Sequence, residues 1–272
     1  MIGSRQIRSI FSTRFINKVK HSIGLKVDPN FEFERISKLG RYNPGNTNLV
    51  STNFRFVDSE SFINQYIDIF EKDTLHFKTD KDDPLIIDCG ANIGMSITYF
   101  KRLYPKSKII GFEPDPKIFE TLKKNLNCFQ GKNLELHEKA VWHKESTLPF
   151  TPDNADGGTI DKDGSITVNT VNINEFLLEE VDFLKIDIEG AEHEVLPAIS
   201  NNLRNVKFLF LELHLDQAVP RQIEEILKLL RENSFVYSFN SLKNIDFDLL
   251  QNSLKSGRFI QQLNIFAVNE NS

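Results

Sequence analysis

Apolar positions follow two different periods along this chain, and from residue 85 onward the two periods alternate. Short apolar runs predict strands at 85–89, 108–112, 133–137, 181–187 and 206–215. Between these runs, apolar residues recur at helical spacing and predict helices that begin near 93, 116, 191 and 221. Strands that alternate with helices are typical of a doubly wound, mostly parallel sheet. Two further runs, at 234–239 and 263–268, predict a closing antiparallel pair.

The chain before residue 80 lacks this alternation. Residues 59–72 predict a helix with an apolar stripe, whereas 28–52 read as irregular and contain a turn cluster at 43–46. Later, 139–171 read as short strands and turns. We therefore expect an N-terminal helical and irregular extension over 1–79 and a Rossmann-like domain over 80–272.

The first segment of the chain is basic. Residues 1–26 carry six lysines and arginines, and no acidic residue precedes Asp28. Apolar residues fall near helical spacing there, so an amphipathic helix is plausible. Three interpretations stay open: a solvated or domain-covering helix, a contact with a membrane surface or partner through 1–26, and an organellar transit peptide.

Composition narrows the class of protein. The formal net charge of −5 argues against nucleic acid as a partner, because phosphate binding needs a basic surface. Cys89 and Cys128 give no disulfide framework, which favours a reducing compartment, and we expect a cytoplasmic protein. No apolar run approaches the roughly 20 residues that a bilayer-spanning helix needs. The oligomeric state stays open.

The first predicted strand leads into a glycine-flanked turn over 88–94. Glycine lets a backbone approach a ligand closely because it carries no Cβ. A dinucleotide turn follows the pattern G-x-G-x-x-G, but counting from Gly90 this chain has Asn92 and Met95 at the later glycine positions. Glu113, at the end of the second strand, is spaced to accept hydrogen bonds from ribose hydroxyls. The turn therefore favours S-adenosylmethionine, a sulfonium without phosphate, over NAD.

Carboxylates follow several of the predicted strands. Asp88, Glu113, Asp187 and Glu212 lie at four strand ends, and these ends meet at one edge of a parallel sheet. A single acid at a strand end is usually a cap or turn former. Four acids at one edge indicate a ligand site.

Three segments resemble the FkbM-type methyltransferases and occur in order: IDCGANIG at 87–94, IGFEPDP at 110–116 and FLKIDIEGAE at 183–192. The resemblance extends from about residue 80 to 215. It implies a class I methyltransferase with a Rossmann-like fold. It also implies transfer of a methyl group from S-adenosylmethionine to a hydroxyl oxygen, often of a sugar or natural product. Beyond residue 240 we recognise no family motif.

The resemblance also implies a role for individual residues. It places the cofactor against residues of the first turn, the second strand end and the segment near 140: Asp88, Gly90, Asn92, Gly94, Glu113, Ala140 and Val141. In this set the glycines and Asn92 would face the methionine half, and Asp88 would orient the turn. Glu113 would hold the ribose, and the pair at 140–141 would form the wall beside the adenine. Asp187 would lie near the transferred methyl group.

Methyl transfer to oxygen needs a proton acceptor, because an alcohol is a poor nucleophile until its proton is removed. We expect His214 or Asp187 to take this proton and Glu212 to orient the histidine or the substrate. Glu212 and His214 share one face of their strand through its period of two, and histidine titrates near neutral pH. The simpler interpretation of His214 is a hydrogen-bonded histidine at a strand end.

Several alternatives remain at this point. We expect no resident metal, although Asp187, Glu189, Glu212 and His214 offer ligands that suit a divalent cation. The expected partner is a small-molecule or glycan acceptor. A non-catalytic cofactor-binding protein, tethered through 1–26, is the second functional class. An NAD-dependent oxidoreductase is the third, and the glycine count disfavours it.

Overall fold

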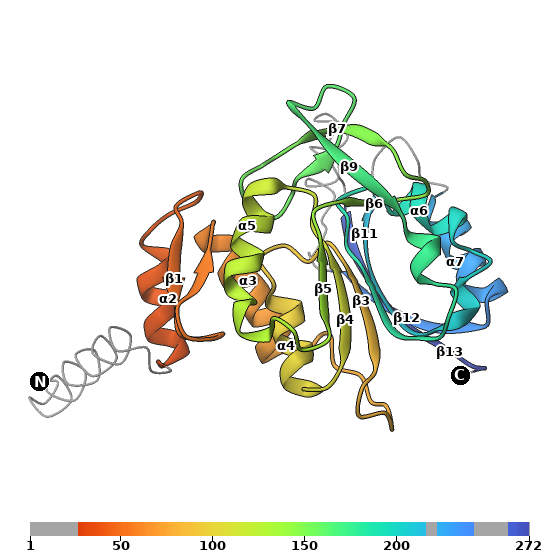
Figure 1. Cartoon of the computed structure of the whole chain (residues 1–272), viewed down its shortest axis with the longest axis horizontal. Coiled ribbons are helices and arrows are strands. Elements are labelled where there is room, and N and C mark those ends of the chain that lie inside the picture. Colours follow the sequence, from red (N-terminus) through yellow and green to blue (C-terminus); the bar gives the residue numbers. More distant parts are fainter. Residues whose placement is uncertain (1–26, 216–221, 242–260, 272) are drawn as a thin grey trace, which may run out of the picture.

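The computed structural model describes residues 27–215, 222–241 and 261–271 (Figure 1). The basic segment 1–26, with its three open interpretations, lies outside these residues. Within the described ranges, no helix is both long enough and apolar enough to cross a membrane.

A seven-stranded sheet forms the centre of the molecule, with the strand order β12-β13-β11-β10-β3-β4-β5. The five strands from β11 to β5 are parallel, whereas β13 runs antiparallel to both of its neighbours. The predicted mostly parallel sheet with an antiparallel last strand is therefore confirmed. Its strands are β3 (Leu85–Cys89), β4 (Lys108–Phe112), β5 (Leu134–His137), β10 (Val181–Ile186), β11 (Val206–Leu215), β12 (Phe235–Ser241) and β13 (Gln261–Asn269).

Helices cover both faces of this sheet (Figure 1). Helices α4 (Met95–Leu103) and α5 (Pro116–Asn125) pack against one face, and α6 (Glu192–Ala198) and α7 (Gln222–Glu232) pack against the other. Helix α5 begins as its sequence predicts, because Asp115 accepts hydrogen bonds from the backbone N–H groups of Lys117 and Ile118. Short 3-10 turns complete the connections: η2 (Asn127–Phe129), η3 (Ile173–Phe176) and η4 (Leu203–Asn205).

A second, smaller sheet lies between β5 and β10 in the sequence. It contains β6 (Ala140–Trp142), β7 (Thr147–Thr151), β8 (Thr159–Ile160) and β9 (Ile166–Asn172), in the order β6-β9-β7-β8. These are the short strands and turns expected over 139–171. The sheet lies above the central strands in Figure 1 and carries the loop between β7 and β8.

The N-terminal extension is more ordered than its sequence suggests. It contains α2 (Pro29–Ser37), the hairpin of β1 (Gly45–Thr47) and β2 (Phe54–Phe56), α3 (Ser59–Tyr66) and a π-helical turn η1 (Ile67–Glu71). The irregular structure predicted for 28–52 is therefore wrong at α2. Asp28 accepts a hydrogen bond from the N–H of Phe31 and Pro29 follows it, which together start a helix.

This extension shares an apolar core with helices α4 and α5, which cover one face of the central sheet. Phe54, Phe56 and Phe62 are buried together with Met95 and Ile118, which belong to α4 and α5. Figure 1 shows α2, β1 and β2 on the outer side of α5, away from the sheet. The boundary at residue 79 stays a prediction.

Candidate active site

The parallel strands end in one row. Pairing joins Cys89 to Phe112 and to Ile186, and Ile186 to Leu211. The residues directly beyond this row are Gly90, Glu113, Asp187 and Glu212. Three of the four predicted carboxylates therefore lie side by side at the carboxyl edge of the sheet, where open α/β sheets bind ligands.

The fourth predicted carboxylate, Asp88, lies one residue earlier and is fully buried. It is paired in register with Lys185, whose Nζ lies 3.3 Å from Asp88 Oδ1 and 3.2 Å from Asp187 Oδ2. The same ammonium donates to the carbonyl of Gly90 at 2.9 Å. Burial disfavours its charge, but Asp187 and Asp88 outweigh burial and raise the pKa of Lys185. Asp88 thus supports the turn from below instead of lining the site.

The turn after β3 approaches the next strand closely. A Cβ at Gly90 would lie 1.8 Å from the carbonyl oxygen of Asp187, and Gly90 has a φ of +85°. Only glycine fits this position. Gly94 also has a positive φ, but it faces α5, where a Cβ would lie 2.8 Å from Leu122. Gly94 is therefore fixed by helix packing and, unlike Gly90 and Asn92, is not part of the cavity wall.

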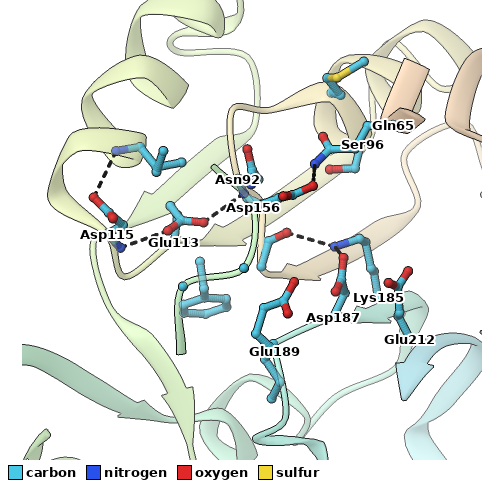
Figure 2. A pocket seen from close by; sticks show the side chains of 18 of the residues that line it. Gln65, Asn92, Ser96, Glu113, Asp115, Asp156, Lys185, Asp187, Glu189 and Glu212 are labelled. Atoms are coloured by element: carbon cyan, nitrogen blue, oxygen red, sulfur yellow. Dashed lines mark hydrogen bonds and ion pairs between the residues drawn. The ribbon is translucent and has the colours of Figure 1, made fainter. Parts of the chain in front are cut away.

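Glu113 is held by backbone on both of its oxygens. Oε2 accepts from the N–H of Asn92 at 3.0 Å, and Oε1 accepts from the N–H of Asp115 at 2.9 Å (Figure 2). Burial nevertheless raises the pKa of Glu113 to about 8, because desolvation of the carboxylate outweighs these two hydrogen bonds. Each oxygen keeps a further lone pair for a ligand hydroxyl.

A cavity of about 630 Å³ lies over this row of strand ends. Among the described residues that line it, eight are Asp or Glu and three are Lys. Gly90, Asn92 and Glu113 line one end together with Ala140 and Val141, as the resemblance implies for a cofactor wall. Its size is that of a small-molecule site, and its acidic lining favours a cationic ligand over a pyrophosphate.

The remaining wall of the cavity comes from parts of the chain that the sequence did not connect with it. Helix α3 and the turn η1 line it through Asn64, Gln65 and Asp68. Asp156, in the loop between β7 and β8, accepts hydrogen bonds from Ser61 Oγ at 2.7 Å and Gln65 Nε2 at 3.4 Å. The extension thus closes the cavity against that loop.

His214 lies behind the cavity, not on its wall. Its ring is fully buried, and Nδ1 lies 3.2 Å from Glu192 Oε1, a carboxylate that also accepts from the N–H groups of Ile188 and Gly190. Burial disfavours the charged imidazole. The hydrogen bond to Glu192 and the neighbouring carboxylates outweigh burial and raise the pKa of His214 to about 10.

Two more carboxylates approach the other ring nitrogen of His214. Nε2 lies 3.3 Å from Glu189 Oε2 and 3.8 Å from Glu212 Oε1, and Gln262 Nε2 is 3.1 Å away. Burial raises the pKa of both glutamates, and for Glu212 the charge of Asp187 adds to the effect. Figure 2 shows Asp187, Glu189 and Glu212 grouped beside Lys185.

Three residues beside His214 and the acceptor end of the cavity were not predicted from the sequence. Gln262 and Asn264 line the cavity from β13, and Glu192 holds His214 from α6. Gln262 and Asn264 are polar residues on one face of a strand whose other face is apolar, and this alternation is the signal that would have found them. Glu192 resembles an ordinary acid in a first helical turn, so no sequence signal marks it.

The sheet order, the glycine turn after β3 and the carboxylate after β4 together define a class I methyltransferase fold, as expected. The sequence model of the family described as "Methyltransferase FkbM domain" matches residues 88–237, more than half of the chain. The chain belongs to this family and is a methyltransferase.

Curated relatives are about a quarter identical to this chain over the aligned segments. The 2-O-methyltransferase NoeI of Sinorhizobium fredii is 27% identical over 203 residues, which cover 65% of this chain and 82% of that protein. The hexuronic acid methyltransferase AglP of Haloferax volcanii is 28% identical over 173 residues, which cover 57% and 70%. Methyltransferase 1 of Beauveria bassiana is 28% identical over 175 residues, which cover 54% and 67%.

A solved structure of methyltransferase FkbM from Methylobacillus flagellatus KT superimposes with a TM-score of 0.47 and 15% sequence identity. The superposition covers 93% of this chain and 70% of that one.

Proposed function

We propose that this protein transfers a methyl group from S-adenosylmethionine to a hydroxyl oxygen of a sugar, glycan or natural product. The observation that carries the proposal is the position of Glu113, which is fixed by backbone N–H groups at the mouth of an acid-lined cavity beside the Gly90 turn. Family membership supports the methyl transfer itself.

The cavity fits this cofactor in charge and in shape. Its acidic lining suits a sulfonium cation. A pyrophosphate would need free backbone N–H groups at the turn, but the N–H of Asn92 is already given to Glu113. The same observation disfavours an NAD-dependent oxidoreductase. When bound, the sulfonium supplies a methyl group that is activated for displacement by a nucleophile.

Each end of the cavity then has its own task. Gly90 and Asn92 would meet the methionine half, and Glu113 would accept hydrogen bonds from the ribose hydroxyls. Ala140 and Val141 would form the apolar wall beside the adenine. Asp88, which does not line the cavity, would hold the turn from below together with Lys185.

The acceptor hydroxyl would enter at the other end, beside Asp187 and Glu212. We propose that Asp187 takes the hydroxyl proton, because Asp187 lines the cavity directly beyond β10 whereas His214 does not reach it. His214 then acts as a positioning residue, since Glu192 and Glu189 hold its two ring nitrogens. Orientation of the hydroxyl toward the methyl group supplies a large part of the rate enhancement.

The acceptor class follows from the relatives. NoeI is named a 2-O-methyltransferase, which supports an oxygen acceptor, and AglP is named a hexuronic acid methyltransferase, which supports a carbohydrate acceptor. The polar wall formed by Gln65, Asn64 and Asn264 would suit a hydroxyl-rich ring. A non-catalytic binding protein stays the second candidate, but an intact row of carboxylates argues for catalysis.

Calorimetric titration with S-adenosylmethionine tests the cofactor assignment. We expect binding to the wild type and a loss of about 10- to 100-fold in affinity in Glu113→Ala, because the substitution removes hydrogen bonds to two ribose hydroxyls, each worth about 0.5–1.5 kcal/mol. Glu120→Ala is the matched control, since Glu120 is an exposed residue of α5 that pairs with Lys123 on the surface. NAD serves as the competing ligand. Equal affinity in both variants, or tighter binding of NAD, contradicts the proposal.

A further inference from the structure

The acceptor end of the cavity brings potential metal ligands together from two neighbouring strands. One ligand atom from each of Asp187, Glu212 and His214 lies within 4.8 Å of the others. Atoms that share a cation at about 2.1 Å lie roughly 3–4 Å apart, so small side-chain rotations would bring the three to coordination distance. Carboxylate clusters are common at strand ends, and this grouping needs independent support.

Asn264 supplies that support. It is paired in register with Glu212 across β11 and β13, and it lines the same cavity. Only 5% of Asn264 is exposed, yet its Oδ1 has no hydrogen-bond partner among the described residues. A buried polar atom without a partner is rare in folded proteins and calls for a ligand. An amide oxygen accepts only hydrogen-bond donors or cations.

The hydrogen bond on Nδ1 of His214 matches that of a metal-bound histidine. Glu192 holds Nδ1 at 3.2 Å, and both side chains are fully buried. A carboxylate on one ring nitrogen fixes the tautomer and turns the other nitrogen toward the metal. Here Nε2 faces Glu212, Glu189 and Gln262, and a cation would insert among these contacts.

The charges of this region are unbalanced. Asp187, Glu189 and Glu212 surround the acceptor end, and Glu192 lies behind it. Among the described residues, two cations face these four carboxylates: the ammonium of Lys185, which Asp187 shares with Asp88, and the protonated ring of His214 between Glu189 and Glu192. The carboxylates are therefore in excess. Partly buried carboxylates that face one another need a compensating positive charge. A divalent cation placed between Asp187 and Glu212 would provide it.

We propose that Asp187, Glu212 and Asn264 on the cavity wall, together with Nε2 of His214 directly behind that wall, bind one divalent cation at the acceptor end. This proposal departs from our sequence-based expectation of no resident metal. Two carboxylates, an amide oxygen and one imidazole form an oxygen-rich set that suits a first-row ion such as Mn²⁺. If the proposed function holds, the cation would bind the acceptor oxygen and lower the pKa of its hydroxyl, which favours transfer of the proton to the carboxylate of Asp187.

Direct binding of Mn²⁺ tests this site without any acceptor. The full-length protein is freed of metal with EDTA and titrated with MnCl₂, and free Mn²⁺ is followed by electron paramagnetic resonance. We expect one Mn²⁺ per chain, bound at least about 10-fold more weakly in Glu212→Gln and in Asn264→Ala. Asn264→Asp adds a charged ligand and tightens binding. Asp163→Asn, an exposed carboxylate in a turn outside the cavity, leaves it unchanged.

A nitrogen signal gives a second readout. Pulsed electron paramagnetic resonance of bound Mn²⁺ should show coupling to one imidazole nitrogen, which disappears in His214→Gln. Circular dichroism identifies variants that fail to fold, and the partly exposed Glu212→Gln keeps the test decisive if His214→Gln is one of them. No saturable Mn²⁺ binding below about 1 mM, a Kd that corresponds to only −4.1 kcal/mol, overturns the site. So does affinity that is equal in wild type, Glu212→Gln and Asn264→Ala.

The proposed function fails in a different way. S-adenosylmethionine is titrated separately into the EDTA-treated wild type. Cofactor binding without Mn²⁺ binding overturns the metal site alone, and Mn²⁺ binding without cofactor binding overturns the methyl-transfer proposal alone.

Discussion

At the cofactor end of the cavity, backbone groups hold the polar side chains, whereas at the acceptor end the carboxylates face one another. Glu113 accepts from two N–H groups and lies beside a turn that is fixed by Gly90. Asp187, Glu189 and Glu212 have no comparable cradle and crowd around a buried imidazole. The hydrogen bonds of the cofactor end are therefore formed before any ligand binds. At the acceptor end, the negative charges are fully compensated only when an acceptor or a cation is present.

The largest effect is expected from Asp187→Asn, which removes the proposed proton acceptor. General-base catalysis contributes about 100- to 10,000-fold, so kcat should fall by that factor. Cofactor affinity should change much less, because Glu113 and the Gly90 turn lie at the other end. Steady-state kinetics and calorimetry measure the two quantities. Equal losses in kcat and in cofactor affinity would mean that the two ends are not separate.

Lys185→Met removes the cation that joins the two ends from below. Asp88 would then be buried without its ion-pair partner, and breaking a buried pair costs about 3–5 kcal/mol of unfolding free energy. Lys139→Met is the control, since Lys139 is partly exposed and its Nζ lies 3.6 Å from Glu145, a surface pair worth about 1 kcal/mol or less. Denaturant unfolding compares the two. Similar losses would show that Lys185 is not a structural cation.

Gly90→Ala tests how tightly the cofactor end is built. Gly90 and Gly131 both have a positive φ, but a Cβ at Gly131 meets no atom within 4 Å. Gly131→Ala should therefore cost only the left-handed strain of about 1–2 kcal/mol. Gly90→Ala should cost roughly 2 kcal/mol more, because its Cβ would collide with the Asp187 carbonyl. Thermal unfolding of the two variants measures the difference in their stability. Equal stability would show that Gly90 does not approach the Asp187 carbonyl as closely as described.

A more gradual effect concerns pH. The pKa of Glu113 is raised to about 8 from the ordinary value of 4.5. Between these values the folded chain holds a proton that the unfolded chain has lost, so the free energy of unfolding falls as pH rises from about 5 to 8. The contribution is at most about 1.4 kcal/mol per pH unit.

Replacing Glu113 by glutamine should remove this contribution, so that the stability of the wild type relative to Glu113→Gln falls as pH rises through this range. Urea unfolding at several pH values measures both slopes, and Glu120→Gln should keep the slope of the wild type. Parallel slopes for wild type and Glu113→Gln would show that burial does not disturb this carboxylate.

The same contrast explains how far the sequence could lead. The cofactor end is made largely by neighbours in sequence: an apolar run, its turn and the acid after the next strand. The turn and Glu113 could therefore be named from spacing, whereas Ala140 and Val141 came only from the family resemblance. Asp88 was grouped with the acids at the strand ends, although the predicted strand 85–89, which matches β3, places it one residue before the end. Gly94 was assigned to the cofactor through the family resemblance, but in the structure its positive φ serves close packing against Leu122 of α5.

The acceptor end depends on contacts between distant segments. Gln262 and Asn264 reach the acceptor end only because β13 inserts beside β11. The order of strands in a sheet cannot be predicted from the local spacing of apolar residues. Helix α3 is held against the cavity by the hydrogen bond from Ser61 to Asp156, two residues that lie far apart in the sequence. Helix α2 is a different case, since its cap at Asp28 and Pro29 was present in the sequence and was overlooked.

Transfer of a labelled methyl group tests the central claim most directly. Extracts of cells that lack this gene are incubated with the purified protein and S-adenosylmethionine carrying ¹³C in its methyl group, and the products are examined by NMR and mass spectrometry. The account predicts label in a methoxy group on a carbohydrate or related product, with incorporation that is lost in Asp187→Asn and retained in Asp163→Asn. Label on nitrogen, sulfur or carbon, or the absence of incorporation by the wild type, would contradict it.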